Sequence, residues 1–380
     1  MPLFFNTIIY GYFILAGYGG YIIWRDRKNP ATFIGRHRTL FLIKFIILII
    51  GALVAIDAHF IEPWTIKLTK AKVPITGINR PIKIALVADL QIGNHKKSLW
   101  TEHIVESIEQ ANPDLVLLGG DLIDNEGNTD DESVYLEPLK KLVGQYPIYY
   151  ILGNHEYGIS NRYGGRTPIQ YTGDRSRLVI ERMKKIGIPL LRNELACPVI
   201  KGQKICIFGI DDIWKFPQPN FSALAALEGQ GASSSSPSAR EGAGGSGSAP
   251  LIFLTHNPDG ILSWPKDLRS PDLVLAGHTH GGQIYLPFIG PLGNANLQLP
   301  KQFYRGLNNF LIRNNNCHPE RSEGSLRLRT IRDSSVVTLP QNDNCASIPI
   351  FTTVGIGESG AALRFWTLPE VAVITLKPAN

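Results

Sequence analysis

The stretch LVLLGGDLID, residues 115–124, joins a short apolar run to two glycines and two carboxylates. Similar apolar runs end at polar or Gly-rich residues elsewhere in the chain, and they cover residues 84–88, 148–152, 204–208, 251–254 and 273–276. Helix-like segments near Leu99–Ala111 and around Tyr135–Leu142 lie between the first of these runs. This alternation predicts a layered α/β fold in which the loops after the strands meet at one edge.

Five short polar motifs directly follow these runs. They are Asp89-Leu90-Gln91, Gly120-Asp121-Leu122-Ile123-Asp124, Gly153-Asn154-His155-Glu156, Thr255-His256-Asn257 and Gly277-His278-Thr279-His280. One aspartate after a strand usually caps a turn or a helix, but five motifs that meet at one edge indicate a site. Carboxylates, amides and imidazoles without thiols suit Mn²⁺, Fe²⁺ or Zn²⁺. The set therefore predicts a two-metal centre of the kind that activates water for phosphoryl transfer.

The motifs resemble those of the calcineurin-like metallophosphoesterase superfamily, whose pattern is D-x-H, G-D-x-x-D, G-N-H-E, a lone His and G-H-x-H. The resemblance extends over roughly residues 83–376. The block GHTHGGQ, residues 277–283, and the tripeptide Gly355-Ile356-Gly357 are similar to the membrane-associated bacterial branch. The resemblance implies a four-layer α-β-β-α sandwich with two divalent metal ions at its loop edge and a hydrolase that acts on phosphoesters.

The resemblance also implies which residues hold the ions. Asp121 would bridge both of them. The remaining ligands would be Asp89, Gln91 and His280 for the first ion, and Asn154, His256 and His278 for the second.

Four further residues receive roles from their motif positions. His155 would be catalytic, since the resemblance implies that it contacts the scissile phosphate and stabilises the transition state or protonates the leaving oxygen. The plainer alternative is a histidine that only orients other groups. Asp124 and Glu156 are expected to orient histidines and backbone around the ligands. Gln91 departs from the family pattern, which has His there, and an amide oxygen binds a transition metal more weakly. His95 could replace it, although a solvated loop histidine is the simpler reading.

Two uncharged runs, Phe4–Trp24 and Leu40–Phe60, are long enough to cross a bilayer. Nothing basic precedes the first run, so it does not read as a cleaved signal peptide. The basic residues between and beside the runs predict a cytoplasmic loop, with both termini and the following domain on the other side; they are Arg25, Arg27, Lys28, Arg36, Arg38 and Lys44. The alternative is a pair of buried core helices.

The sequence thus predicts a membrane anchor over residues 1–62 and a catalytic domain over residues 63–380. Two segments, 229–248 and 314–346, lack apolar periodicity and are expected to be flexible insertions. The four cysteines show no CxxC spacing and do not settle the compartment.

The leading hypothesis is a membrane-anchored phosphoesterase that hydrolyses phosphodiester, phosphomonoester or pyrophosphate bonds of a lipid-linked substrate. Two alternatives remain open: a UDP-2,3-diacylglucosamine pyrophosphatase of lipid A synthesis, which would need a cytoplasmic domain, and a non-catalytic membrane scaffold, for which Gln91 is the argument. Nucleic acid is not an expected partner. The net charge of +6 derives largely from the N-terminal basic cluster, and no aromatic single-strand groove accompanies the motifs.

Overall fold

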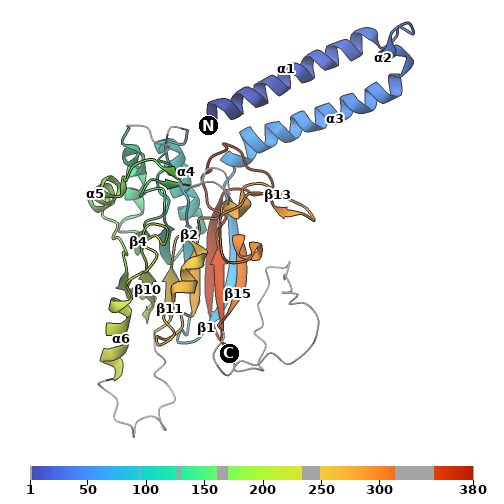
Figure 1. Ribbon diagram of the computed structural model, residues 1–380. Helices are drawn as coiled ribbons and strands as arrows, with labels where there is room; N and C mark the ends of the chain where they lie inside the picture. The colour runs from blue at the N-terminus through green and yellow to red at the C-terminus, as the bar shows by residue number, and fades with distance from the viewer. Residues whose placement is uncertain are drawn as a thin grey trace, which may run out of the picture.

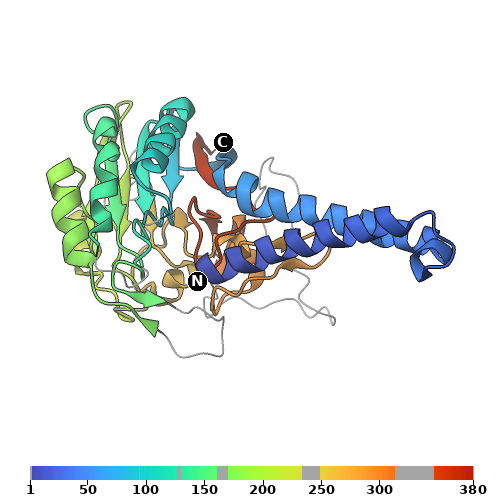
Figure 2. The ribbon, with the colours of Figure 1, turned by 90° about the horizontal axis from the view of Figure 1, so that it is seen from above.

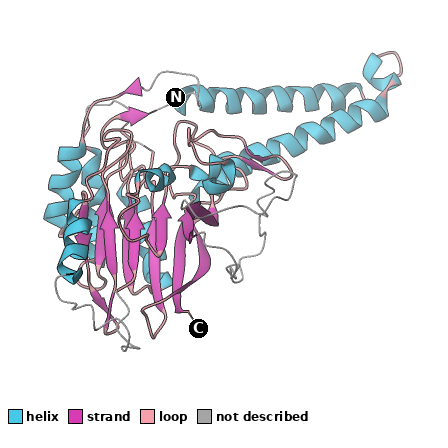
Figure 3. Ribbon diagram, turned by 60° about the horizontal axis from the view of Figure 1, so that its bottom comes forward, coloured by secondary structure: helices cyan, strands magenta, loops and turns pink. Residues whose placement is uncertain are grey.

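The computed structural model describes residues 2–93, 95–125, 130–160, 170–232, 249–312 and 346–379 (Figure 1). Its centre is a pair of β-sheets, seen as the adjoining magenta strands of Figure 3. The first sheet has the order β1-β17-β2-β3-β4, and β2, β3 and β4 run parallel. Its strands are β1 Lys67–Ile75, β17 Glu370–Pro378, β2 Ile82–Val87, β3 Leu115–Gly119 and β4 Ile148–Ile151.

The second sheet has the order β15-β16-β12-β11-β10-β7, and its four middle strands are parallel. Its strands are β15 Gly306–Ile312, β16 Ala346–Thr352, β12 Leu273–Ala276, β11 Leu251–Leu254, β10 Cys206–Gly209 and β7 Glu194–Ala196. Because both sheets carry parallel strands, the polar residues that follow those strands meet at one edge of the domain.

Helices cover the outer face of each sheet. The first sheet is covered by α4 Ser98–Ala111, the 3₁₀ helix η3 Glu132–Leu142 and α5 Ser176–Ile186. The second is covered by α6 Ser222–Ala232 and two 3₁₀ helices, η5 Pro258–Ser263 and η7 Lys301–Tyr304.

Alternating side chains of each strand belong to different layers of the core. Val87 packs outward with the helices over the first sheet, whereas Leu86 faces the space between the sheets. There it belongs to the same buried cluster as Ile252 and Leu275 of the second sheet, while Phe253 points to the opposite, helix-covered face. These three buried layers confirm the predicted four-layer α-β-β-α order.

The N-terminal segment forms a helical hairpin that projects away from the domain (Figures 1 and 2). It consists of α1 Pro2–Asp26, α2 Phe33–Arg36 and α3 Arg38–Ile56, and the hydroxyl of Tyr12 donates to the carbonyl of Leu48 at 2.8 Å. Within the described part of the chain, one helical stretch, Thr39–Trp64, is long and apolar enough to span a membrane, with a mean hydropathy of 2.8. None of its most apolar window is buried, which contradicts the core-helix alternative for this segment. A span over α1 remains a prediction.

The end of α3 is attached to the domain. The helix continues through the π-helix η1 Asp57–Ile61 and the 3₁₀ turn η2 Glu62–Trp64. The carboxylate of Glu62 is buried and accepts hydrogen bonds from the backbone N–H groups of Trp366 at 2.8 Å and Thr367 at 2.7 Å. The N–H of Arg364 also donates to the carbonyl of Ala58 at 2.8 Å. The hairpin therefore joins the domain through a hydrogen-bonded contact rather than through a free linker.

Some predicted boundaries need correction. The segment Tyr135–Leu142 lies within the 3₁₀ helix η3, which contains Pro138, rather than in an α-helix. The predicted insertion 229–248 begins too early, since α6 extends to Ala232, and the insertion 314–346 includes the first residue of β16. The rest of both predicted insertions lies outside the described residues.

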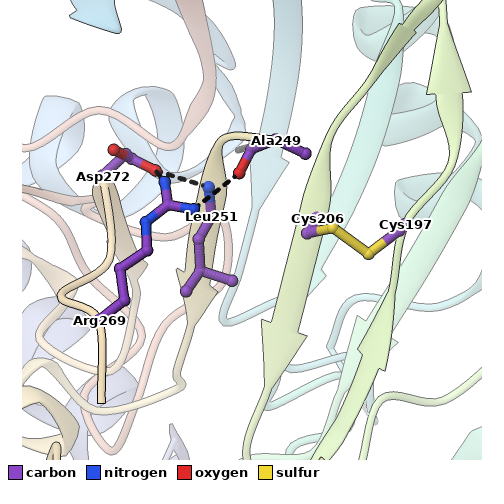
Figure 4. Close-up of a disulfide and its surroundings, with 6 residues drawn as sticks. All are labelled: Cys197, Cys206, Ala249, Leu251, Arg269 and Asp272. Atoms are coloured by element: carbon purple, nitrogen blue, oxygen red, sulfur yellow. Dashed lines mark hydrogen bonds and ion pairs between the residues drawn. A yellow bond between two sulfur atoms is a disulfide. The ribbon is translucent and has the colours of Figure 1, made fainter. Parts of the chain in front are cut away.

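A disulfide joins Cys197 to Cys206, a pairing that the sequence analysis did not predict (Figure 4). It links the residue after β7 to the first residue of the neighbouring antiparallel strand β10. In the same view, Asp272 accepts a hydrogen bond from the N–H of Leu251 at 2.7 Å and pairs with Arg269. These contacts fix the edge of the second sheet that lies opposite the site.

Candidate metal centre

Every predicted site residue comes after a strand, and the structure brings all of them together at the carboxyl edge of the two sheets. Asp89 and Gln91 follow β2, Asp121 follows β3, Asn154 and His155 follow β4, His256 follows β11, and His278 and His280 follow β12. All eight residues are buried, none more than 8% exposed.

The backbone is strained at five of these positions. Asp89, Gln91, Asp121, His278 and His280 have φ angles of 54°, 45°, 51°, 69° and 49°. A non-glycine residue in this left-handed region costs about 1–2 kcal/mol, and such residues concentrate where a fold holds side chains for function. The left-handed turns after the strands thus orient these polar side chains towards one common position.

The backbone conformation and close surroundings of Gly120 explain why a glycine precedes the aspartate of the Gly-Asp motif. Its φ is +88°, and a Cβ atom there would lie 2.8 Å from both the backbone nitrogen of Gly153 and Nδ1 of His256. A side chain would push apart the loops that carry Asp121 and Asn154.

The second predicted metal position is compact. Asp121, His256 and His278 offer ligand atoms that all lie within 4.8 Å of one another and could hold a metal ion. Oδ2 of Asp121 lies 3.1 Å from Nε2 of His256. Oδ1 of Asn154 lies 3.1 Å from the same nitrogen and 2.9 Å from Nδ1 of His278.

Hydrogen bonds on the far side of both rings fix which nitrogen faces the cluster. Nδ1 of His256 lies 2.8 Å from the carbonyl of Gly119, and Nε2 of His278 lies 3.2 Å from that of Ala295. Each of these nitrogens carries the ring proton, because a carbonyl can only accept. The opposite nitrogen therefore faces the cluster, and it is the nitrogen that could bind a metal ion once it carries no proton.

The ligands of the first predicted metal ion lie farther apart than those of the second. Nε2 of His280 lies 3.6 Å from Oδ1 of Asp89 and 3.3 Å from Nε2 of Gln91. Among the described residues, no group donates to the buried Oε1 of Gln91. A buried oxygen without a donor costs free energy, and an ion at this position would satisfy it. The residues present thus fit a cation, although Gln91 offers an amide where the family has an imidazole.

The electrostatics of the pocket also favour a cation. Burial raises the pKa of Asp89 to about 7, and the charge of Asp121 adds to this rise. Burial would lower the pKa of His256, but Asp121 and other carboxylates raise it to about 10. Burial and the neighbouring His256 lower the pKa of His278 to about 3, which keeps its imidazole neutral and able to bind a metal. Burial disfavours the charge of the carboxylate of Asp89, and nearby divalent ions would stabilise that charge.

His155 lies at the rim of the cluster. Its backbone N–H donates to Oδ1 of Asp121 at 2.8 Å, and its Nδ1 donates to the carbonyl of Asp124. Nε2 consequently faces the centre, 4.0 Å from Oδ2 of Asp121 and 3.4 Å from Nε2 of Gln91. Burial opposes the charged ring, but Asp121 and Asp124 raise the pKa of His155 above its ordinary value. A ring in this position could hold a proton next to a substrate.

Glu156 organises the loops as predicted, through backbone groups. Its carboxylate accepts from the N–H groups of Asp121, Leu122, Ile123 and Gly153 at 3.1, 2.6, 3.2 and 2.7 Å. One buried side chain thereby ties the β3 loop to the β4 loop.

The structure adds a buried acid that the sequence analysis missed. Asp212 follows β10, and burial raises its pKa to about 7 with a further contribution from Asp121. Its Oδ2 accepts no hydrogen bond from the described residues. The signal was present, since Asp211 and Asp212 follow an apolar run as the five motifs do.

Two other expectations concern the surroundings of the site. His95 is exposed, as expected of a loop histidine, whereas Lys96 is buried and donates to the carbonyl of Pro63 and to Glu358, each at 2.7 Å. The ring of Trp214 lies edge-on to the ring of His278, with 4.6 Å between the two ring centres. Trp214 also lines a cavity of about 360 Å³ together with Ile213, Pro217 and Leu262.

Comparison with known proteins agrees with this geometry. Residues 82–282 match the family model of the calcineurin-like phosphoesterases. An uncharacterized metallophosphoesterase of Helicobacter pylori is 30% identical over 316 residues, which are 83% of this chain and 65% of that protein. The phosphodiesterase YaeI of Escherichia coli is 29% identical over 276 residues, 70% of this chain and 85% of that protein. A transmembrane protein with metallophosphoesterase domain of Danio rerio is 26% identical over 63% of this chain and 50% of its own length.

The chain belongs to the calcineurin-like phosphoesterase family, because the family model matches more than half of it. This confirms the predicted superfamily and enzyme class, hydrolases that act on phosphoesters. The chain spans about two thirds of the length of its Helicobacter relative.

Proposed function

We propose that this protein is a membrane-anchored phosphodiesterase that uses two divalent ions to hydrolyse a lipid-linked phosphoester outside the cytoplasm. The convergence of Asp121, Asn154, His256 and His278, with one nitrogen of each ring turned inward, carries the proposal. Bound ions would supply an activated water and neutralise charge on the phosphoryl group. The chain would hold the first ion through Asp89, Gln91, Asp121 and His280, and the second through Asp121, Asn154, His256 and His278.

In the proposed reaction His155 is the catalytic side chain. Its Nδ1 hydrogen bond to the carbonyl of Asp124 fixes the ring, and its Nε2 faces the cluster. The raised pKa of His155 favours the protonated ring, which can donate a hydrogen bond to a phosphoryl oxygen and a proton to the leaving oxygen. Asp121 and Asp124 hold this positive charge in place.

Two observations support a site outside the cytoplasm. The basic residues lie around α2, at the end of the hairpin remote from the domain, and the positive-inside rule makes that end cytoplasmic. The disulfide between Cys197 and Cys206 belongs in an oxidising compartment. Both argue against the UDP-2,3-diacylglucosamine pyrophosphatase alternative, whose substrate is cytoplasmic. The comparison with YaeI favours a phosphodiester over the other bonds considered.

The test uses full-length protein in liposomes with Mn²⁺, offered in turn a phospholipid phosphodiester, a lipid phosphomonoester and a lipid pyrophosphate. We expect the phosphodiester to be cleaved fastest and an Asp121→Asn variant to be inactive on all three. Preference for the pyrophosphate would favour the rejected alternative. A folded, metal-loaded protein that is inert on all three, and on soluble diesters, would favour the scaffold.

A further inference from the structure

A short hairpin beside the site exposes its most apolar residues. Strands β13 Tyr285–Leu286 and β14 Gly290–Pro291 pair antiparallel, and the turn between them carries Phe288 and Ile289, which are 96% and 71% exposed. Phe288 has a φ of 66°, a strained conformation for a bulky residue. Phe288 and Ile289 therefore form an apolar tip that is open to solvent.

The hairpin is connected through residues 364–366 to η1 and η2, the turns that continue α3. The backbone N–H of Tyr285 donates to the carbonyl of Phe365 at 2.9 Å, and that of Phe365 donates to the carbonyl of Gln283 at 3.1 Å. The neighbouring residues of Phe365 bind Ala58 and Glu62 at the end of α3. The hairpin accordingly projects from the domain on the same side as α3 (Figures 1 and 3).

The surroundings of the hairpin match the chemistry of a membrane surface. Residues 281–312 contain no acidic side chain and two basic ones, Lys301 and Arg305. The ammonium of Lys301 donates to the carbonyl of Pro291 at 3.1 Å, and the guanidinium of Arg305 lies 4.9 Å from the ring centre of Tyr285. Aromatic residues with flanking cations are typical of the lipid interface, where anionic head groups attract basic side chains.

The hairpin also connects directly to the predicted metal ligands. It begins five residues after His280, and the N–H of Gly293 donates to the carbonyl of Gly282 at 3.1 Å. A Cβ atom on Gly282 would lie 2.4 Å from Cβ of Pro291, so the base of the hairpin packs tightly on the ligand loop. The position of the hairpin therefore fixes the distance of the site from whatever the tip binds.

We infer that the tip of the β13–β14 hairpin enters the head-group region of the bilayer beside α3 and so holds the metal centre at the membrane surface. This inference rests on the membrane anchoring proposed above. The occupant is an anionic lipid surface, because the uncharged hairpin adjoins the end of the one described helix that can span a membrane, and the charged side chains that contact it, Lys301 and Arg305, are basic.

The first test measures depth and needs no enzymatic activity. Phe288→Cys is introduced into full-length protein that also carries Cys317→Ser and Cys345→Ser, labelled with a nitroxide and reconstituted in nanodiscs with anionic lipid. Leu227→Cys, exposed on α6 at the end of the domain remote from α3, is the matched control (Figure 1). We expect the label at 288 to be more accessible to oxygen than to a water-soluble nickel complex, and the label at 227 to show the reverse.

Equal accessibility at the two positions overturns the inference. Spin–spin broadening of the label at 288 that grows with protein density would show that the tip contacts a second copy of the chain. That result would also overturn the inference. Because the measurement needs no turnover, unchanged protein that is inert on every substrate but has an inserted tip contradicts only the proposed function. Asp121→Asn should insert its tip to the same depth as the unchanged protein.

The second test separates membrane contact from chemistry. Phe288→Gln combined with Ile289→Gln should lower hydrolysis of a vesicle-embedded phospholipid by about tenfold or more, since partition of the tip depends on its apolar area. Hydrolysis of a soluble diester should not change, and Leu227→Gln should leave both rates unaltered. An unchanged rate on vesicles, with soluble activity intact, overturns the inference.

Discussion

Replacing Glu156 by glutamine should damage both stability and metal binding. The carboxylate accepts four backbone N–H groups, two on each oxygen: Leu122 and Ile123 on Oε1, Asp121 and Gly153 on Oε2. An amide offers one oxygen, so in either orientation two buried donors would face an NH₂ group. Each buried donor left unsatisfied costs about 1–3 kcal/mol, which gives about 2–6 kcal/mol for Glu156→Gln.

The loss should be measured by urea unfolding of the metal-loaded, full-length protein in detergent, together with its metal content. Glu106→Gln, on the exposed face of α4, is the matched control and should stay within about 0.5 kcal/mol of the unchanged protein. We expect Glu156→Gln also to bind less metal, because Asp121 and Gly153 lie on the two loops that it joins. A variant within about 1 kcal/mol of the unchanged protein, with full metal content, would refute this reasoning.

Three further outcomes follow from individual contacts. Gln91→His should tighten metal binding about tenfold or more, measured by competition with a chelator, because imidazole is the stronger ligand; unchanged affinity would show that this position does not touch the ion. Burial lowers the pKa of Lys96 to about 8, so folding disfavours its charge, and the free energy of unfolding should rise as the pH increases from 8 towards 10.5. Urea midpoints of Lys96→Met should lack this rise. An equal dependence on pH in both proteins would contradict the lowered pKa of Lys96. Removal of the Cys197–Cys206 disulfide by double serine substitution should cost about 3 kcal/mol for its short loop, and reductant should then shift the melting temperature of the unchanged protein only.

The position of the site could be predicted from the sequence because each functional side chain directly follows a strand. The residues after β2, β3, β4, β11 and β12 need no long-range information to be placed at one edge, since parallel strands end together. The layer to which each side chain belongs could not be predicted, because the run 84–88 is apolar throughout and its neighbours Leu86 and Val87 belong to different layers of the core.

Contacts between distant segments could not be predicted in this way. Arg364 is wholly buried and donates to the carbonyl of Gly357, which also lies 3.2 Å from Nδ1 of His280. Its sequence context, an arginine among apolar residues, gives no sign of this role. The burial of Lys96 beside Glu358 and the pairing of Cys197 with Cys206 likewise depend on which loops the fold brings together. Local patterns carry no information on such pairs.

The most direct measurement is metal-dependent hydrolysis of bis-p-nitrophenyl phosphate by the full-length protein in detergent. The protein is stripped of metal, reloaded stepwise with Mn²⁺ or Zn²⁺, and assayed for turnover and bound metal in the same sample, beside Asp121→Asn. We predict that turnover rises with bound metal up to two ions per chain and falls about 10²-fold or more in Asp121→Asn. Turnover that does not depend on metal, or a folded protein with two bound ions that is no faster than Asp121→Asn, would contradict a two-metal phosphoesterase.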